Sequence, residues 1–241
     1  MNILVVSDNV LLVSEFIRVT EATCYQEYSF DYKYSSINKA PAALEVLGMS
    51  KIDVKSSAEE VAASYDLVIS AHCKQIFPDY LVSSVRCINI HPGLNPFNRG
   101  WFPQVFSIIN GKPAGVTVHL MDKEIDHGDI IIQREVKLSS EDTSQTAYDK
   151  IQQEEIALIE EHLLSWITCD YSASRPSETG NYNGISDFKE LCQLDLTSTG
   201  TLQQHLDLLR ALTHGDYANA YYVNEQGEKV YVRVELSKEQ Q

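Results

Sequence analysis

The sequence predicts an α/β fold, in which a mainly parallel sheet is flanked by helices and followed by a small C-terminal region of helices and a β-hairpin. Two observations predict it. Short apolar runs typical of buried strands alternate with segments of helical spacing through the first two thirds of the chain. A polar stretch at 171–184, rich in Ser, Gly and Asn, then interrupts this alternation. We therefore expect a larger domain at 1–170, a linker at 171–184 and a smaller region at 185–241.

The larger domain opens on a short apolar run, and several similar runs follow it. The expected strands are 2–7, 52–54, 66–70, 86–90, 115–121 and 129–138. The expected helices between them are 10–22, 57–64, 79–84 and 101–109. The longest helical signal spans 144–167, where the apolar residues share one broad face and Ser144 offers an N-terminal cap.

The C-terminal region begins with a short helix and a second helix at 201–212. Two apolar segments, 218–223 and 229–236, follow and are separated by a short polar turn, a pattern typical of a β-hairpin. A two-stranded hairpin is only marginally stable alone, so its apolar face needs a cover. We expect it to form a homodimer, and the alternative is that it folds back over 185–212.

Size and composition set the class of protein. The chain has 241 residues, enough for one substantial core, with 44% hydrophobic and 22% charged residues, as in soluble globular proteins. No apolar run approaches the roughly 20 residues of a membrane span. The first residues lack the basic and apolar segments of a secretory signal. These features predict a cytoplasmic protein without a membrane partner.

Charge, cysteines and glycines exclude several functions. A net charge of −15 argues against a nucleic-acid partner, although a few local cations can still hold a small phosphorylated ligand. The five cysteines are scattered without Cys-x-x-Cys spacing, which predicts reduced thiols and no metal site. The turn at 7–10 after the first strand contains no glycine, and the sequence has no P-loop. A nicotinamide-dependent dehydrogenase is therefore excluded.

The most informative segment is Asn89-Ile90-His91-Pro92-Gly93, which is followed later by Asp126 in a second polar loop. Asn89 and His91 are two apart at the end of an expected strand, so their side chains point to the same face. An amide donor, a histidine and a carboxylate are suited to proton transfer with stabilisation of an oxyanion. The alternatives are that His91 binds backbone at the strand end and that Asp126 caps a turn.

The stretch from Asn89 to Asp126 resembles the formyltransferases that use 10-formyltetrahydrofolate. The matching motifs are, in order, Asn89-Ile90-His91-Pro92, Asn98-Arg99-Gly100, Asn110-Gly111, Thr117-Val118-His119 and Ile125-Asp126-His127-Gly128. Within that family the chain looks most like the sugar-nucleotide N-formyltransferases, because of segments 70–78, 93–103 and 209–213. The resemblance implies a Rossmann-like formyltransferase domain at 1–170.

The resemblance also implies a reaction and its residues. N10-formyltetrahydrofolate would be the co-substrate, without a metal. The acceptor would be a dTDP-linked amino-dideoxyhexose, first of all dTDP-4-amino-4,6-dideoxy-D-glucose, used for bacterial surface polysaccharide such as the O-antigen of lipopolysaccharide. Asn89, His91 and Asp126 would be catalytic. The folate-binding residues would be Gln75, Ile76, Phe77, Met121, Asp122 and Ile125. Residues 93–95 read Gly-Leu-Asn where many relatives read Ser-Leu-Leu, which leaves the shape of the acceptor pocket open.

Five further residues are candidates for the acceptor site. Lys74 and Asn9 follow expected strands, at the edge where open α/β sheets bind ligands, and suit the diphosphate. Tyr221 or Tyr222 can stack on the base or simply pack in the hairpin. Arg210 suits either the diphosphate or a salt bridge.

Three other functions compete with this one. A methionyl-tRNA formyltransferase needs a basic C-terminal platform, whereas 177–241 holds ten acidic residues against five Lys and Arg. A purine-nucleotide formyltransferase fits a shorter chain without the hairpin, and a silent folate- or nucleotide-binding module needs none of the three polar residues. An imidazole of ordinary pKa at His91 predicts activity that rises from about pH 6 to a plateau near pH 8.

Overall fold

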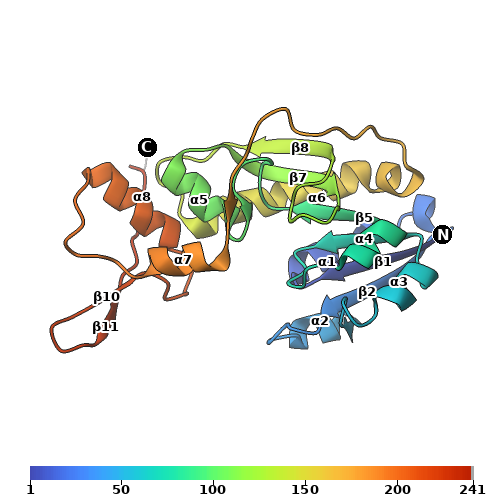
Figure 1. Ribbon diagram of the computed structural model, residues 1–241, viewed down its shortest axis with the longest axis horizontal. Coiled ribbons are helices and arrows are strands. Elements are labelled where there is room, and N and C mark those ends of the chain that lie inside the picture. The colour runs from blue at the N-terminus through green and yellow to red at the C-terminus, as the bar shows by residue number, and fades with distance from the viewer. Residues whose placement is uncertain (240–241) are drawn as a thin grey trace.

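The computed structural model describes residues 1–239 and contains a seven-stranded mixed sheet (Figure 1). Its strand order is β3-β2-β1-β4-β5-β7-β8. The strands are β1 (Asn2–Ser7), β2 (Ser29–Ser35), β3 (Ser50–Ile52), β4 (Leu67–Ala71), β5 (Arg86–His91), β7 (Ala114–Leu120) and β8 (Ile130–Val136). The first five are parallel, and β7 and β8 add to β5 in antiparallel fashion. The predicted fold class is therefore confirmed.

Helices cover both faces of this sheet. They are α1 (Val10–Thr20), α2 (Ala42–Val46), α3 (Ala58–Ser64), α4 (Asp79–Ser84), α5 (Pro103–Asn110) and α6 (Ser144–Thr168). The alternation of side chains along β1 shows the layering, because Ile3 and Val5 pack in the core beneath α1 and α6. Leu4 and Val6 pack on the opposite face, beneath α3 and α4. Burial on both faces explains the continuous apolar run of β1.

One strand of this sheet and helix α2 were not predicted, and one helix cap was misplaced. Strand β2 was not predicted because its polar residues, including Asp31 and Lys33, interrupt any apolar run. The predicted cap Ser144 is instead the first, buried residue of α6. Thr143 caps this helix, and its hydroxyl accepts a hydrogen bond from the Thr146 N–H.

The order of the strands reverses between β1 and β4. From β1 the chain winds outward through β2 and β3, and it then returns to β4 and winds the other way to β5. In open α/β sheets the crevice at the carboxyl ends of two such strands is the usual ligand site. Asn9 follows β1 and His72 follows β4, so both lie at this switch point.

The C-terminal region packs beside α5 rather than on the sheet (Figure 1). It contains α7 (Ile185–Cys192), α8 (Leu202–Leu212) and the hairpin strands β10 (Tyr221–Val223) and β11 (Lys229–Tyr231). The hairpin is shorter than predicted, and it projects away from the sheet. Val232, just beyond β11, packs with the helices, so part of this segment does fold back over 185–212. Within residues 1–239, no helix combines the length and the apolar character that a membrane crossing requires.

Candidate active site

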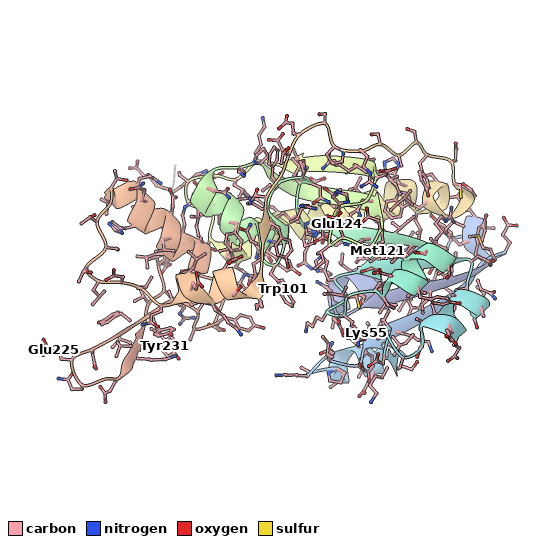
Figure 2. The ribbon with its side chains drawn as sticks, viewed as in Figure 1. Lys55, Trp101, Met121, Glu124, Glu225 and Tyr231 are labelled. Carbon is pink, nitrogen blue, oxygen red and sulfur yellow. The ribbon has the colours of Figure 1, made fainter. Side chains whose placement is uncertain are left out.

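A cleft with a cavity volume of about 720 Å³ opens at the carboxyl ends of the parallel strands. Its walls come from the loops after β1 and β4, the end of β5, the segment 100–105, the loop 121–126 and the start of α6. The C-terminal region contributes the remaining wall through 182, 188 and 214–219. Trp101, Met121 and Glu124, which are labelled in Figure 2, belong to this lining.

Asn89, His91 and Asp126 come together in this cleft, as the sequence predicts. Asn89 Nδ2 donates a hydrogen bond to Asp126 Oδ1 at 3.0 Å. His91 is almost fully buried, and its Nδ1 lies 3.5 Å from Asp126 Oδ2. Its Nε2 has no hydrogen-bond partner among residues 1–239. Gly93 permits this position of the ring, because a β-carbon there would lie 2.4 Å from His91 Nε2.

Asp126 is held from several sides. Its backbone is left-handed, with φ of 49°, which turns the carboxylate out of the loop and into the site. Oδ2 accepts a hydrogen bond from the Gly100 N–H at 3.1 Å, and the Asp126 carbonyl accepts one from Asn95 Nδ2 at 2.9 Å. The carboxylate is therefore fixed by backbone and side-chain donors and not free to rotate.

Burial and neighbouring charges both shift the pKa values of the pair. For His91 burial dominates over the favourable charge of Asp126 and lowers the pKa to about 4. For Asp126 burial opposes ionisation, but the nearby His91, His119 and the Gly100 N–H together lower the pKa to about 2. At neutral pH the site holds a carboxylate and a neutral imidazole. The expectation of an ordinary pKa at His91 is wrong, because the sequence did not reveal that its ring is buried.

Two side chains of strand β7 fix Asn89 and the turn after His91. His119 Nδ1 donates to the Leu120 carbonyl at 2.8 Å, which leaves His119 Nε2 as an acceptor for Asn89 Nδ2 at 3.3 Å. Thr117 Oγ1 donates to the Gly93 carbonyl at 2.7 Å and fixes the turn after His91. Both Nδ2 hydrogens of Asn89 are thus engaged with protein acceptors.

The segment predicted as a linker runs along the outer edge of the sheet and then past the site (Figure 1). Within it, β9 (Tyr182–Asn183) pairs with β6 (Arg99–Gly100), the strand whose Gly100 N–H binds Asp126. Gly180 packs so closely that a β-carbon there would lie 1.7 Å from the Pro96 carbonyl oxygen. We call residues 172–183 the strap, because they hold the catalytic loop from outside.

Arg175 joins the N-terminal part of the strap to the loop that carries Asp126. Its guanidinium forms ion pairs with Asp122 at 3.2 Å and with Asp129 at 2.7 Å, on either side of Asp126. His127 Nδ1 lies 2.8 Å from the same Asp122 carboxylate. The catalytic loop therefore depends on contacts with a segment about 50 residues later in the chain, which sequence reasoning missed.

A second polar cluster in the cleft was also missed. His72 Nε2 lies 2.8 Å from Glu155 Oε1, and His72 Nδ1 lies 2.9 Å from the Tyr148 hydroxyl. Asn9 Nδ2 donates to the Tyr148 hydroxyl at 3.1 Å, while Asn9 Oδ1 caps α1. Tyr148 and Glu155 are seven residues apart on α6, so they share one face of the helix. That spacing is the one signal that the sequence offered.

All six residues predicted to bind the folate line the cleft. They are Gln75, Ile76, Phe77, Met121, Asp122 and Ile125. Ile76 is 61% exposed and Ile125 39% exposed, and Trp101, which was not predicted, is 41% exposed beside them. These three side chains form an apolar wall that is open to a planar ligand.

Of the five predicted acceptor residues, Asn9 and Lys74 line the cleft and three do not. Arg210 is buried against Asp207 and donates to the Asp142 carbonyl at 2.7 Å, so it joins α8 to the start of α6. Tyr221 and Tyr222 lie in β10, where Tyr221 stacks under Lys229 at 3.8 Å. Contact of these three with a ligand in the cleft of the same chain is not supported. Tyr182, Phe188 and Tyr217 supply the aromatic wall instead.

Within residues 1–239, no three His, Cys, Asp or Glu side chains are grouped to hold a metal ion. The arrangement of amide, neutral imidazole and carboxylate suits transfer of an acyl-type group to a nucleophile that the substrate supplies.

Comparison with family models gives two matches. Residues 39–163 match the formyl transferase model, and residues 187–238 match the N-formyltransferase dimerization C-terminal domain. The first match covers the sheet strands that carry the catalytic candidates, and the second covers the hairpin region.

Individual proteins match over the whole chain. A dTDP-4-amino-4,6-dideoxyglucose formyltransferase of Mycobacterium tuberculosis is 44% identical over 243 residues, covering 99% of this chain and 98% of the relative. The X-ray structure of a sugar N-formyltransferase from a Shewanella species superposes with a TM-score of 0.98 at 53% identity, covering 100% and 99%. A 4-N formyltransferase from Francisella tularensis gives a TM-score of 0.93 at 44% identity, covering 98% of each chain.

Proposed function

Because the chain belongs to the formyl transferase family, we propose that it transfers a formyl group from N10-formyltetrahydrofolate to the amine of a dTDP-linked amino-dideoxyhexose. The observation that carries the proposal is the cluster of Asn89, His91 and Asp126 in one cleft beside an apolar wall. The names of the Mycobacterium and Francisella relatives favour the 4-amine of dTDP-4-amino-4,6-dideoxy-D-glucose. Its product would serve bacterial surface polysaccharide such as the O-antigen.

The reaction needs little covalent chemistry from the protein. The substrate amine attacks the formyl carbon, the new C–N bond forms through a tetrahedral oxyanion, and the bond from carbon to N10 of the folate breaks. Asn89 stabilises that oxyanion once one of its Nδ2 hydrogens leaves Asp126 or His119 for the ligand. One such donor contributes roughly 3–4 kcal/mol in acyl transfer. His91 and Asp126 move the amine proton toward the leaving nitrogen.

The two substrates would occupy different parts of the cleft. The apolar wall of Trp101, Ile76 and Ile125 suits the pterin ring, because a planar aromatic ligand gains most from exposed apolar side chains. The polar edge at the switch point, with Asn9 and Lys74, suits the nucleotide sugar. The formyl carbon would then meet the amine between them, at Asn89 and His91.

The alternative functions, formylation of a tRNA and silent binding, fit this chain less well. A tRNA requires a basic surface, whereas the region from 177 to 241 is acidic, with ten acidic residues against five Lys and Arg. A silent binding module would have no use for a carboxylate that three separate contacts hold in place.

An assay with purified protein and N10-formyltetrahydrofolate tests the proposal. We expect turnover with dTDP-4-amino-4,6-dideoxyglucose and none above background with methionyl-tRNA or a purine ribonucleotide. The matched dTDP-linked 3-amino sugar tests the position of the amine. Turnover with tRNA, or no turnover with any amino sugar, contradicts the proposal.

We also propose that the C-terminal region forms a homodimer. Several large apolar side chains of this region are exposed, among them Leu196, Leu202, Val223 and Tyr231. The match to a dimerization domain supports this assignment. In light scattering we expect a dimer for the native chain and a monomer for a Val223→Glu, Tyr231→Glu double variant. A native chain of monomeric mass at micromolar concentration rules the dimer out.

A further inference from the structure

The two catalytic groups that the motif predicts are poor proton acceptors. An amine next to electron-withdrawing substituents has a pKa of about 8, so most of it carries a proton at neutral pH and cannot attack. Burial lowers the pKa of His91 to about 4, and the pKa of Asp126 is about 2. Neither group can hold the surplus proton of an ammonium at pH 7. A further group in the cleft that accepts this proton would let the protonated acceptor react.

His72, after β4, and Tyr148, on α6, line the same cleft, and Glu155 lies behind them, fully buried. His72 directly follows Ala71, the register partner of Ile90, so His72 and His91 leave adjacent strands at the same level. Backbones of paired strands lie roughly 5 Å apart. Burial is the main cause of the low pKa of His91, and a charge on His72 lowers this pKa further. His72 has a left-handed φ of 60°, and its ring bonds to Tyr148 and Glu155 on α6.

The hydrogen bonds in this cluster form one chain, in which each donor points toward Glu155. His72 Nε2–H donates to Glu155 Oε1, which is fully buried and accepts only. His72 Nδ1 is then an acceptor for the Tyr148 O–H, and the Tyr148 oxygen accepts from Asn9 Nδ2. The Tyr148 oxygen keeps one further acceptor position and lines the cleft.

We propose that Tyr148, His72 and Glu155 form a proton relay that removes the surplus proton from the acceptor's ammonium group, an inference that rests on the proposed formylation of an amine. The ammonium gives a proton to the Tyr148 oxygen while the Tyr148 hydroxyl proton passes to His72 Nδ1. The amine is left neutral, Tyr148 is again a phenol, and His72 becomes an imidazolium paired with the Glu155 carboxylate. Tyr148 touches the substrate, whereas His72 and Glu155 act through it.

The charges around the relay favour this direction. Glu155 is fully buried and its Oε2 has no hydrogen-bond partner among residues 1–239, so an imidazolium beside it neutralises an otherwise uncompensated charge. Burial also raises the pKa of Tyr148, which keeps its hydroxyl protonated and able to pass the proton on. The other titratable groups that face the relay are His91 at the end of β5, Asp149 on α6, and His214, whose ring packs on Tyr148.

Two isosteric variants test the relay, Tyr148→Phe and Glu155→Gln, with kcat/KM for the amino sugar measured from pH 6.5 to 9.5. At pH 7 we expect each variant to lose about 100-fold, the usual size of general acid–base assistance. The loss should shrink to a few-fold at pH 9.5, where the free amine is already neutral. Tyr34→Phe is the matched control, because Tyr34 also donates to a glutamate, Glu45 at 2.7 Å, but outside the cleft.

The outcomes are distinct. A loss that is the same at every pH, or no loss in Tyr148→Phe, overturns the relay while wild-type turnover still supports formylation of the sugar. A wild-type protein that formylates no amino sugar overturns both. Circular dichroism of each variant at pH 7 and 9.5 checks the fold. A variant that has lost its fold is replaced by His72→Gln, which interrupts the same relay and must show the same pH-dependent loss.

Discussion

Two imidazole–carboxylate pairs lie at the ends of neighbouring strands, and they differ in almost every other respect. His91 at the end of β5 faces Asp126 across 3.5 Å, and His72 after β4 faces Glu155 across 2.8 Å. Asp126 accepts two further hydrogen bonds from Asn89 and Gly100, whereas Glu155 keeps one oxygen without a partner among residues 1–239. The first pair is fixed by protein donors, whereas the second pair belongs to the proposed relay.

The largest expected effect is a loss of turnover in variants of the His91–Asp126 pair, and this loss should not depend on pH. Asp126→Asn keeps the shape of the side chain but removes the charge and one of the two acceptor oxygens, so we expect turnover to fall at least roughly 100-fold. His91→Ala should lose a similar amount. Kinetics of both variants at pH 7 and 9.5 provide the measurement.

Raising the pH should not restore either variant, in contrast to the relay variants. Near-wild-type turnover of His91→Ala would remove this residue from the mechanism. Recovery of Asp126→Asn at pH 9.5 would show that the two pairs do the same work, and the distinction between them would fail.

The first pair was predictable from the sequence and the second was not. Asn89 and His91 belong to one strand, and Asp126 follows within a short ordered series of motifs, so local spacing reveals them. His72 and Glu155 are 83 residues apart, and they meet only because α6 packs beneath the sheet. The strap was predicted as a polar linker for the same reason, since pairing of β9 with β6 leaves no local signal.

The second expected effect concerns stability, and it comes from burial of His91. Its pKa falls from 6.5 to about 4 on folding, so below pH 6.5 the unfolded chain binds a proton that the native chain does not. Stability should therefore be complete above pH 6.5 and decline as the pH falls toward 4, by about 3 kcal/mol from this residue. Urea unfolding at pH 7 and pH 4.5 measures the decline.

His91→Gln is the matched variant for that measurement, because it cannot take up the proton in either state. Its stability should change less between the two pH values than that of the wild type. Burial also lowers the pKa of His214, but this contribution is present in both proteins and cancels in the difference. Equal slopes for the two proteins would mean that His91 is not buried in the way that its surroundings indicate.

The smallest expected effect tests whether the strap serves only the first pair. Gly180→Ala places a β-carbon 1.7 Å from the Pro96 carbonyl oxygen, so the strap must shift where β9 pairs with β6. Gly100 then moves relative to Asp126, and misplacement of about 1 Å costs up to roughly 100-fold in rate. We expect a loss of about 10-fold in kcat that is independent of pH, since the strap bonds here to Arg99, Gly100 and Asn98. Gly184→Ala is the matched control, because that glycine has a φ of −86° and a β-carbon there would come no closer than 3.5 Å to its neighbours. A loss in Gly180→Ala that disappears at pH 9.5 would place the strap on the relay side of the cleft and would contradict the division of the site into one pair held by the strap and one pair in the relay.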